Sequence, residues 1–210
     1  MMYWLIKNLY AIFAKTYLSY RVIDRENLLD LNDGGYVVAS NHVSFLDPPL
    51  VGIAFPENIY FFARKSLFDN AIFGWVLRSI QAIPVNQAQP EMSTLKHIIQ
   101  LLKDGEKVVI FPEGERTHDG EIKEKGQSGV GMMVEKSQAK ILPVRLFGPE
   151  KALPRHSKKL VRVPVTLVVG KPMDVTDLVE NKELDRKARY EAITARIMDA
   201  IRELECPERD

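Results

Sequence analysis

The chain has 210 residues, 46% of them hydrophobic, which is typical of one globular domain with a substantial core. A formal charge of +1 argues against a nucleic-acid partner, because nucleic-acid-binding proteins usually carry a strong excess of basic residues. The single cysteine, Cys206, excludes an intramolecular disulfide, and no Cys/His spacing is typical of a zinc site. We therefore expect a protein of a reducing cytosol without a structural metal.

The N-terminal segment is aromatic and apolar but is not typical of a membrane span. Lys7 and Lys15 interrupt it before it reaches the roughly 20 apolar residues that a span needs. No small-residue cleavage site follows it, so a removable signal peptide is not expected. With helical periodicity, an apolar face opposes a polar one: Leu5, Ile6, Leu9, Ile12, Phe13 and Tyr17 against Lys7, Asn8, Lys15 and Ser19. This pattern predicts an amphipathic helix.

The helix has two alternative positions. Most amphipathic helices pack on their own domain. Trp4 and the tyrosines beside lysines favour a membrane interface instead, because amphipathic rings prefer the headgroup zone. We interpret residues 1–30 as an amphipathic segment at the membrane interface and residues 31–210 as the main domain.

The main domain alternates between strand and helix patterns, without internal repeats. Short apolar runs rich in β-formers predict strands at residues 36–39, 58–63, 82–85, 107–111, 141–147 and 161–169. Patterns bounded by Pro, Asp, Asn or Gly predict helices at residues 48–55, 67–79, 90–102, 129–136 and 183–204. The alternation predicts an α/β fold with a mixed, largely buried sheet flanked by helices and an N-terminal amphipathic helical segment.

A histidine and an aspartate follow the first predicted strand of this domain. His42 and Asp47 belong to the run NHVSFLDPP, and strand ends in α/β folds are where ligands usually bind. Residues five apart in a helix point about 140° away from each other, so a turn must bring the two side chains together. A histidine held by a carboxylate can remove a proton from an alcohol. Asp47 also precedes Pro48, which favours an extended conformation and leaves a helix N-cap as its alternative role.

A second polar run, FPEGERT, follows the apolar residues 107–110. Arg116 offers a planar guanidinium fork that matches phosphate oxygens, and Gly114 permits the close backbone approach that such a site requires. Glu113 could orient Arg116 or bind an acceptor hydroxyl. The alternative is a tight surface turn with an ion pair.

Together, the runs from His42 to Asp47 and from Phe111 to Arg116 resemble the HxxxxD and FPEGxR motifs of the glycerolipid acyltransferases, the family of bacterial 1-acylglycerol-3-phosphate acyltransferases. FARKSLF at residues 62–68 looks like the second block of that family, and ILPV at residues 141–144 is similar to its fourth. The resemblance covers about residues 36–148. It implies the following site residues: His42 as general base, Asp47 as its partner, Lys65 and Arg116 near the acceptor phosphate, and Glu113 and Gly114 as residues that shape this site.

The resemblance also implies a function in phospholipid biosynthesis. The expected reaction moves a fatty acyl group from acyl-CoA or acyl-carrier protein directly onto 1-acylglycerol 3-phosphate and gives phosphatidic acid. The donor is a substrate, so no cofactor is expected. Membrane lipid and the donor are the expected partners, in peripheral or monotopic association with the cytoplasmic face of a membrane. The alternatives are acyl transfer to glycerol 3-phosphate or another lysolipid, and a catalytically silent lipid-binding relative.

Three residues depart from the family pattern and leave the acceptor open. Glu115 stands where the family usually has Thr or Ser, Asn86 where a basic residue is common, and Gln127 where many members have Lys. Each change lowers the positive charge near the expected anionic substrate, and unpaired like charges weaken binding.

The remaining polar positions have simpler interpretations. Ser44 lacks a surrounding GxSxG motif and is interpreted as structural. A structural role is also favoured for His97, and a substrate contact for His118. The basic run at residues 151–159 either meets anionic lipid or an acidic carrier protein, or forms a solvated loop.

Overall fold

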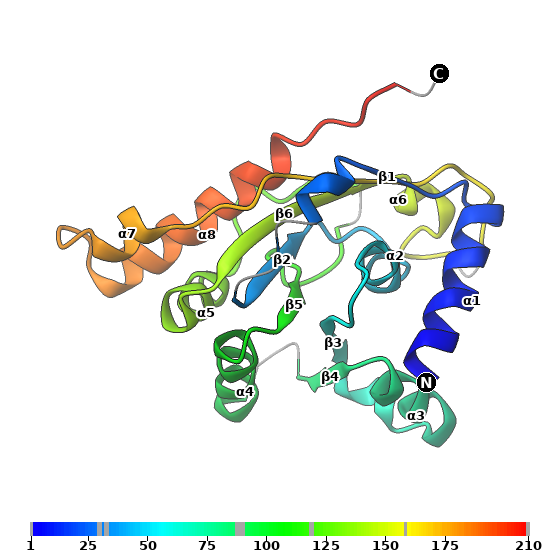
Figure 1. Ribbon diagram of the computed structural model, residues 1–210, viewed down its shortest axis with the longest axis horizontal. Helices are drawn as coiled ribbons and strands as arrows, with labels where there is room; N and C mark the ends of the chain where they lie inside the picture. The colour runs from blue at the N-terminus through cyan, green and yellow to red at the C-terminus, as the bar shows by residue number, and fades with distance from the viewer. Residues whose placement is uncertain are drawn as a thin grey trace.

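The computed structural model describes residues 2–28, 31, 34–86, 91–117, 120–157 and 159–208. Within these residues, seven strands form one sheet in the order β1-β7-β6-β2-β5-β3-β4 (Figure 1). The strands are β1 (Arg21–Ile23), β2 (Tyr36–Ser40), β3 (Tyr60–Arg64), β4 (Ala82–Val85), β5 (Lys107–Ile110), β6 (Lys140–Phe147) and β7 (Thr166–Val169).

Neighbouring strands in most of the sheet run in the same direction. β6, β2, β5, β3 and β4 pair in parallel, whereas β7 pairs antiparallel with β6, and β1 pairs in parallel with β7. The segments that follow β2, β3, β5 and β6 therefore all start at one edge of the sheet. In α/β folds this edge is where ligands bind.

Helices cover both faces of the sheet (Figure 1). On one face, α1 (Met2–Tyr17), α2 (Asp47–Ala54) and α3 (Ala71–Ser79) contribute to one hydrophobic cluster. On the other, α4 (Met92–Lys103), α5 (Ser128–Ser137) and α8 (Arg186–Arg202) contribute to a second. The shorter described elements are α6 (Pro149–Ala152), α7 (Thr176–Glu180) and the 3-10 helices η1 (Arg25–Leu28) and η2 (Lys65–Phe68).

The central strand β2 connects the two clusters. All of its side chains are buried, and successive ones point to opposite faces. Tyr36 and Val38 belong to the cluster beneath α1 and α2, and Val37 and Ala39 to the cluster beneath α5 and α8. Burying one such valine contributes about 1.5–3 kcal/mol, so β2 is a rigid support for the residues that leave its carboxyl end.

The predicted fold class is confirmed, because a mixed sheet lies between two helical layers. β7 begins at Thr166 rather than at Val161, since Pro164 lacks the N–H group that a strand ladder needs. β1 is too short for a recognisable alternating pattern and was not predicted. It gives residues 1–30 an edge strand of the sheet; the division at residue 30 stays a prediction.

Side-chain caps account for two differences in the helices. Residues 67–79 divide into η2 and α3 because Asn70 caps α3, accepting a hydrogen bond from the Phe73 N–H at 2.9 Å. Asp185 caps α8 by accepting from the Ala188 N–H at 2.8 Å, so this helix begins later than residue 183. The expected start of the fourth helix at Pro90 lies outside the described residues.

The amphipathic helix is present as α1, but the predicted polar face is wrong for Lys7, while Asn8 and Lys15 are exposed as expected. Lys7, expected on the polar face, points inward and donates hydrogen bonds to the carbonyls of Phe55 and Glu57 just beyond α2. Ala14 is fully buried in the same interface. The apolar side chains that point outward are Leu5, Leu9 and Ile12, which are 54%, 60% and 61% exposed. Polar contacts with α2 thus outweigh the simple hydrophobic pattern in orienting the helix.

These contacts agree with the first of the two positions considered for α1, packing on the domain, while the position at a membrane interface stays a prediction. One face of the helix packs on the domain, through Tyr10, Phe13 and Tyr17 among others, while its outward face remains apolar. Among the described residues, no helix has both the length and the hydropathy needed to cross a bilayer.

Candidate active site

Asn41 fixes the direction of the chain where β2 ends. Its side-chain amide donates to the Leu146 carbonyl at 2.9 Å and accepts from the Leu146 N–H at 2.8 Å. Both residues are buried, and each such bond contributes about 1 kcal/mol. The pair joins the end of β2 to β6 and sets where His42 leaves the sheet. No sequence pattern singles out this asparagine.

His42 and Asp47 are in direct contact. Nδ1 of His42 lies 2.8 Å from Oδ2 of Asp47, whose side chain is fully buried, while the imidazole keeps 14% of its surface exposed. The same carboxylate oxygen accepts the N–H groups of Val43 and Ser44 at 2.7 Å each, which forms the expected turn. With Asp47 ionised, Nδ1 carries the proton, and Nε2 has the lone pair that a general base needs.

Asp47 is the first residue of α2, which corrects the expected extended conformation and the alternative N-cap role. Leu46 holds the N-cap position, without a side-chain capping bond. Three hydrogen bonds turn the Asp47 carboxylate back toward residues 42–44, and they outweigh the conformational preference of a residue before proline. Pro48 and Pro49 occupy the first turn, where a helix needs no N–H donor.

The FPEGERT run joins the first loop through backbone hydrogen bonds. Oε1 of Glu113 accepts the N–H of His42 at 2.7 Å, and Oε2 accepts the N–H of Lys123 at 3.2 Å. The Thr117 N–H donates to the His42 carbonyl at 2.9 Å. Glu113 is 1% exposed, and burial raises its pKa while the two N–H donors act in the opposite direction. The hydrogen bonds of Glu113 therefore position the backbone of His42 rather than the side chain of Arg116.

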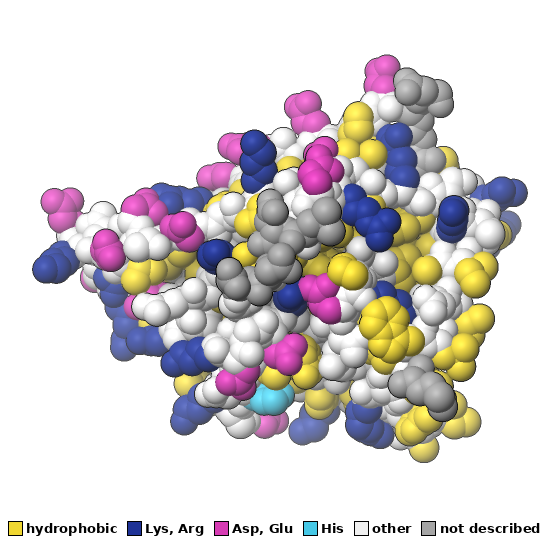
Figure 2. All heavy atoms as spheres, in the orientation of Figure 1, with side chains coloured by type: hydrophobic (Ala, Val, Ile, Leu, Met, Phe, Trp, Pro, Cys, Tyr) yellow, Lys and Arg dark blue, Asp and Glu magenta, His cyan; other side chains and the backbone are white. Residues whose placement is uncertain are grey.

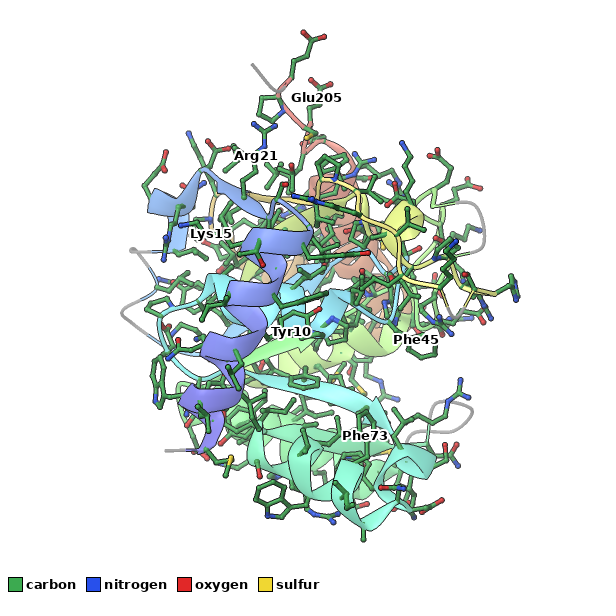
Figure 3. The ribbon with its side chains drawn as sticks, turned by 90° about the vertical axis from the view of Figure 1, so that its right-hand side faces the viewer. Tyr10, Lys15, Arg21, Phe45, Phe73 and Glu205 are labelled. Carbon is green, nitrogen blue, oxygen red and sulfur yellow. The ribbon has the colours of Figure 1, made fainter. Side chains whose placement is uncertain are left out.

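Two aromatic rings pack on the functional side chains. The His42 imidazole stacks on Phe111, with ring centroids 4.1 Å apart. The guanidinium carbon of Arg116 lies 3.5 Å from the ring centroid of Phe45, a cation–π contact. Phe45 comes from the loop before α2 and is visible at the surface in Figure 3. Phe45, which occupies an unspecified position of the HxxxxD motif, thus holds the Arg116 side chain in place.

Gly114 permits the turn between the glutamate and the arginine. Its φ is +76°, in the left-handed region, and its N–H donates to the Phe111 carbonyl at 3.0 Å. A Cβ atom here would lie 2.9 Å from Cγ of Gln127. Any other residue would strain the backbone and crowd Gln127, so Gly114 shapes the loop that carries Arg116.

Arg116 lies among other charged groups. Burial lowers its pKa, the positive charges of Arg155 and Arg64 lower it further, and the charge of Asp47 acts in the opposite direction. Its Nη1 atom is buried and has no hydrogen-bond partner among the described residues. A buried guanidinium donor without a protein acceptor is suited to bind an anion.

The block at residues 62–68 contains Arg64, whose positive charge lowers the pKa of Arg116. Arg64 is the last residue of β3, which pairs with β5. Lys65 begins η2, and its ammonium group lies 3.6 Å from the carboxylate of Glu91, with both side chains largely exposed. The structure therefore favours Arg64, rather than Lys65, as the cation of this block that acts on Arg116. The two adjacent basic residues in the sequence were the available signal.

Of the other candidates, Ser44 has a structural role in the first loop, His97 lies apart from the site, and His118 is not among the described residues. The Ser44 hydroxyl donates to the Leu153 carbonyl at 2.9 Å and ties the first loop to the segment after α6. His97 is exposed on α4, and His118 lies outside the described residues. Within the described part of the chain, no group of three or more His, Cys, Asp or Glu side chains could hold a metal ion.

Known proteins with similar sequences define the class. A family model described as "Acyltransferase" matches residues 19–146, which include His42, Asp47, Glu113 and Arg116. The two loops found at one edge of the sheet thus belong to an acyltransferase domain. This chain belongs to the glycerolipid acyltransferase family, as its two motifs predicted.

Named relatives support this assignment, and one solved structure has a similar fold. The chain is 32% identical to a 1-acyl-sn-glycerol-3-phosphate acyltransferase of Bacillus subtilis, over 88% of this chain and 87% of that protein. It is 31% identical to one of Streptococcus pneumoniae, over 70% of this chain and 53% of that protein. Its fold is similar to the crystal structure of the 1-acyl-sn-glycerophosphate acyltransferase PlsC from Thermotoga maritima. That likeness has a TM-score of 0.71 at 23% identity and covers 98% of this chain and 81% of the other.

Proposed function

We propose that this acyltransferase moves a fatty acyl group from a thioester donor onto the free hydroxyl of 1-acylglycerol 3-phosphate. One arrangement carries the proposal: the His42–Asp47 pair, joined at 2.8 Å, lies beside Arg116, whose buried Nη1 has no partner among the described residues. The acceptor offers a matching group for each, a hydroxyl for the base and a phosphate for the guanidinium. The names of the two bacterial relatives support the same acceptor.

In this mechanism the acyl group passes directly to the acceptor. Nε2 of His42 takes the proton of the acceptor hydroxyl while the hydroxyl oxygen attacks the thioester carbonyl. Asp47 keeps the proton of the neutral imidazole on Nδ1 and stabilises the imidazolium that forms. The carbon–sulfur bond then breaks, and His42 returns the proton to the departing sulfur, which leaves as a thiol. The product is phosphatidic acid, and no acyl-enzyme is formed.

The cations beside the dyad hold the acceptor phosphate. Arg116 presents its planar fork to the phosphate oxygens, and Arg64 adds a second positive charge from the end of β3. Gly114 shapes the loop that carries Arg116, and Glu113 holds the backbone of His42. Lys65, which the family resemblance implies for the same phosphate, stays a prediction.

The reaction takes place at the cytoplasmic surface of a membrane, with acyl-CoA or acyl-carrier protein as donor. Figure 2 shows apolar side chains along the border formed by α1 and α3. On α3 the exposed ones are Ile72, Phe73 and Trp75, which join Leu5, Leu9 and Ile12 of α1. Phe45 of the site and Phe73 lie on the same side of the molecule (Figure 3). Exposed apolar surface of this extent favours lipid contact, and the acceptor would enter from that side.

A panel of acceptors tests the proposed reaction. Purified enzyme would receive labelled acyl-CoA or acyl-carrier protein with 1-acylglycerol 3-phosphate, glycerol 3-phosphate or a neutral monoacylglycerol, and thioester loss and lipid product would be measured. We expect kcat/KM for 1-acylglycerol 3-phosphate to exceed the others by about tenfold or more, because only this acceptor fills the lipid and phosphate contacts together. Activity restricted to the neutral acceptor would contradict the proposal. Inactivity with every acceptor would favour the silent lipid-binding alternative.

The same assay tests the general base. His42→Ala is expected to lower kcat by about a hundredfold to ten-thousandfold without unfolding the protein. His97→Ala, on the exposed side of α4, is the matched control and should leave kcat unchanged. Unaltered turnover in His42→Ala would refute the base assignment, and an added acyl mass on quenched enzyme would refute direct transfer.

A further inference from the structure

Arg155 belongs to the basic run that was expected to meet anionic lipid or an acidic carrier protein, or to form a solvated loop, but its side chain turns toward the candidate site. It follows α6, which continues from β6 on the opposite side of β2 from β5. Its Nη1 donates a hydrogen bond to the carbonyl of Arg116, and its Nη2 lies 3.7 Å from the Glu115 carboxylate. Only 23% of the Arg155 side chain is exposed. These contacts anchor the FPEGERT loop from a segment outside both sequence motifs.

Arg155 completes a group of three guanidinium side chains. Arg64 comes from the end of β3, Arg116 from the loop after β5, and Arg155 from the segment after β6. The charges of Arg64 and Arg155 both act on Arg116. Like charges that act on one another in this way repel, and a bound anion relieves that repulsion. The buried Nη1 of Arg116, without an acceptor among the described residues, independently indicates an anionic ligand.

Glu115, the residue that departs from the family pattern, holds Arg155 in this group. Its carboxylate lies 3.0 Å from the ammonium group of Lys123 and 3.7 Å from the guanidinium of Arg155. Its negative charge is therefore shared with two cations and does not stand unopposed beside Arg116. The sequence alone suggested that Glu115 weakens binding of an anionic acceptor; in the structure its charge is paired, and one of its two partners is Arg155.

We propose that Arg155, held by Glu115, is a specificity-determining residue that favours a phosphate monoester over a phosphodiester or uncharged headgroup in the acceptor. A monoester carries about two negative charges at neutral pH, whereas a phosphodiester carries one. The third cation therefore stabilises the monoester more than the diester. This inference rests on the proposed acyl transfer to 1-acylglycerol 3-phosphate and names what selects that headgroup.

The test compares two acceptors that differ by one charge. KM and kcat would be measured for Arg155→Gln with 1-acylglycerol 3-phosphate and with its phosphate methyl ester. We expect KM for the monoester to rise about tenfold to a hundredfold, KM for the methyl ester to rise less than about threefold, and kcat to stay within about threefold. Arg155→Lys, which keeps the charge but not the fork, should recover part of the loss. Lys159→Gln, exposed in the same basic run, is the matched control and should change neither KM.

A second pair of variants tests the role of Glu115. Glu115→Thr should raise KM for the monoester in the wild-type background but have little further effect when combined with Arg155→Gln, because its contribution acts through Arg155. Equal increases in KM for both acceptors, or no increase for the monoester, would overturn the inference. Thermal unfolding of each variant checks that the fold is kept.

Direct binding separates this inference from the reaction itself. Binding of sn-glycerol 3-phosphate would be measured calorimetrically with wild-type protein, Arg155→Gln and His42→Ala. Weaker binding in Arg155→Gln but not in His42→Ala supports the inference whatever the acceptor panel shows. Unchanged binding in Arg155→Gln overturns it. Failure of wild-type enzyme to acylate 1-acylglycerol 3-phosphate would count against the proposed function alone.

Discussion

Glu113 acts on the His42–Asp47 pair through the backbone. Its carboxylate accepts the N–H groups of His42 and Lys123 inside the protein, where an unsatisfied N–H would cost about 1–3 kcal/mol. A carboxylate in a polar turn could equally have faced the substrate, and the sequence motif alone did not distinguish the two. The observed bonds favour a positioning role, in which Glu113 fixes where the imidazole starts from the sheet.

Glu113→Gln distinguishes positioning from substrate binding. The amide keeps the size of the side chain but turns its NH2 group toward one of the two backbone donors. We expect kcat to fall about tenfold to a hundredfold, while KM for the acceptor changes less than about threefold. Steady-state kinetics measure both, with Glu124→Gln, an exposed residue of the following loop, as control. A raised KM at unchanged kcat would show that Glu113 binds the acceptor directly.

The helix α1 supports α2, and with it the start of the site. Lys7 donates to carbonyls beyond the end of α2, where the helix dipole is negative. The Tyr10 hydroxyl is buried and has no partner among the described residues; burial raises its pKa, and the charge of Asp47 adds to this effect. α1 therefore reaches the surroundings of the Asp47 carboxylate. Deleting the helix would test folding as much as membrane binding, so substitutions are the sharper tool.

Lys7 makes the stability of this helix pair depend on pH. Burial lowers its pKa to about 8 in the folded protein, and the charge of Glu57 opposes this shift. Between this value and about 10.4 in the unfolded chain, the unfolded state binds more protons, so folding becomes more favourable as pH rises. Lys7→Met lacks this contribution. We therefore expect the Tm of wild type, relative to Lys7→Met, to rise between about pH 8 and pH 10.

Thermal unfolding across this pH range is the measurement. Lys15→Met, on the exposed side of the same helix, should track wild type at every pH. A difference in Tm between wild type and Lys7→Met that stays constant with pH would contradict the assignment.

The whole molecule shows which features a sequence can predict. His42, Asp47, Glu113, Gly114 and Arg116 belong to two short sequence motifs whose own spacing carries the information, so their grouping could be predicted. Arg155 was not, because its position depends on the strand order β6-β2-β5-β3, which no local pattern encodes, whereas for Arg64 the available signal was its place beside Lys65. The inward position of Lys7 on α1 was mispredicted for a related reason. Which side of a helix is buried depends on its tertiary partners, here the end of α2.

Exposed apolar side chains of α1 and α3 form the surface that we expect to contact the membrane. Leu5, Leu9 and Ile12 point away from the domain, so replacing all three with Gln should leave Tm within a few degrees of wild type. Full burial of one such side chain in lipid stabilises the bound state by about 1.5–3 kcal/mol. Each of the three is already partly covered by the protein, so its contribution to vesicle binding is smaller. We therefore expect binding to anionic vesicles to weaken about a hundredfold. Turnover should fall with acceptor embedded in vesicles but persist with acceptor dispersed in detergent.

Sedimentation with vesicles and both activity assays measure this, with Met92→Gln on α4, at the opposite face of the sheet, as control. Undiminished sedimentation of the triple variant would move the membrane contact to α3 or elsewhere, and Trp75→Gln would then be the next variant to measure.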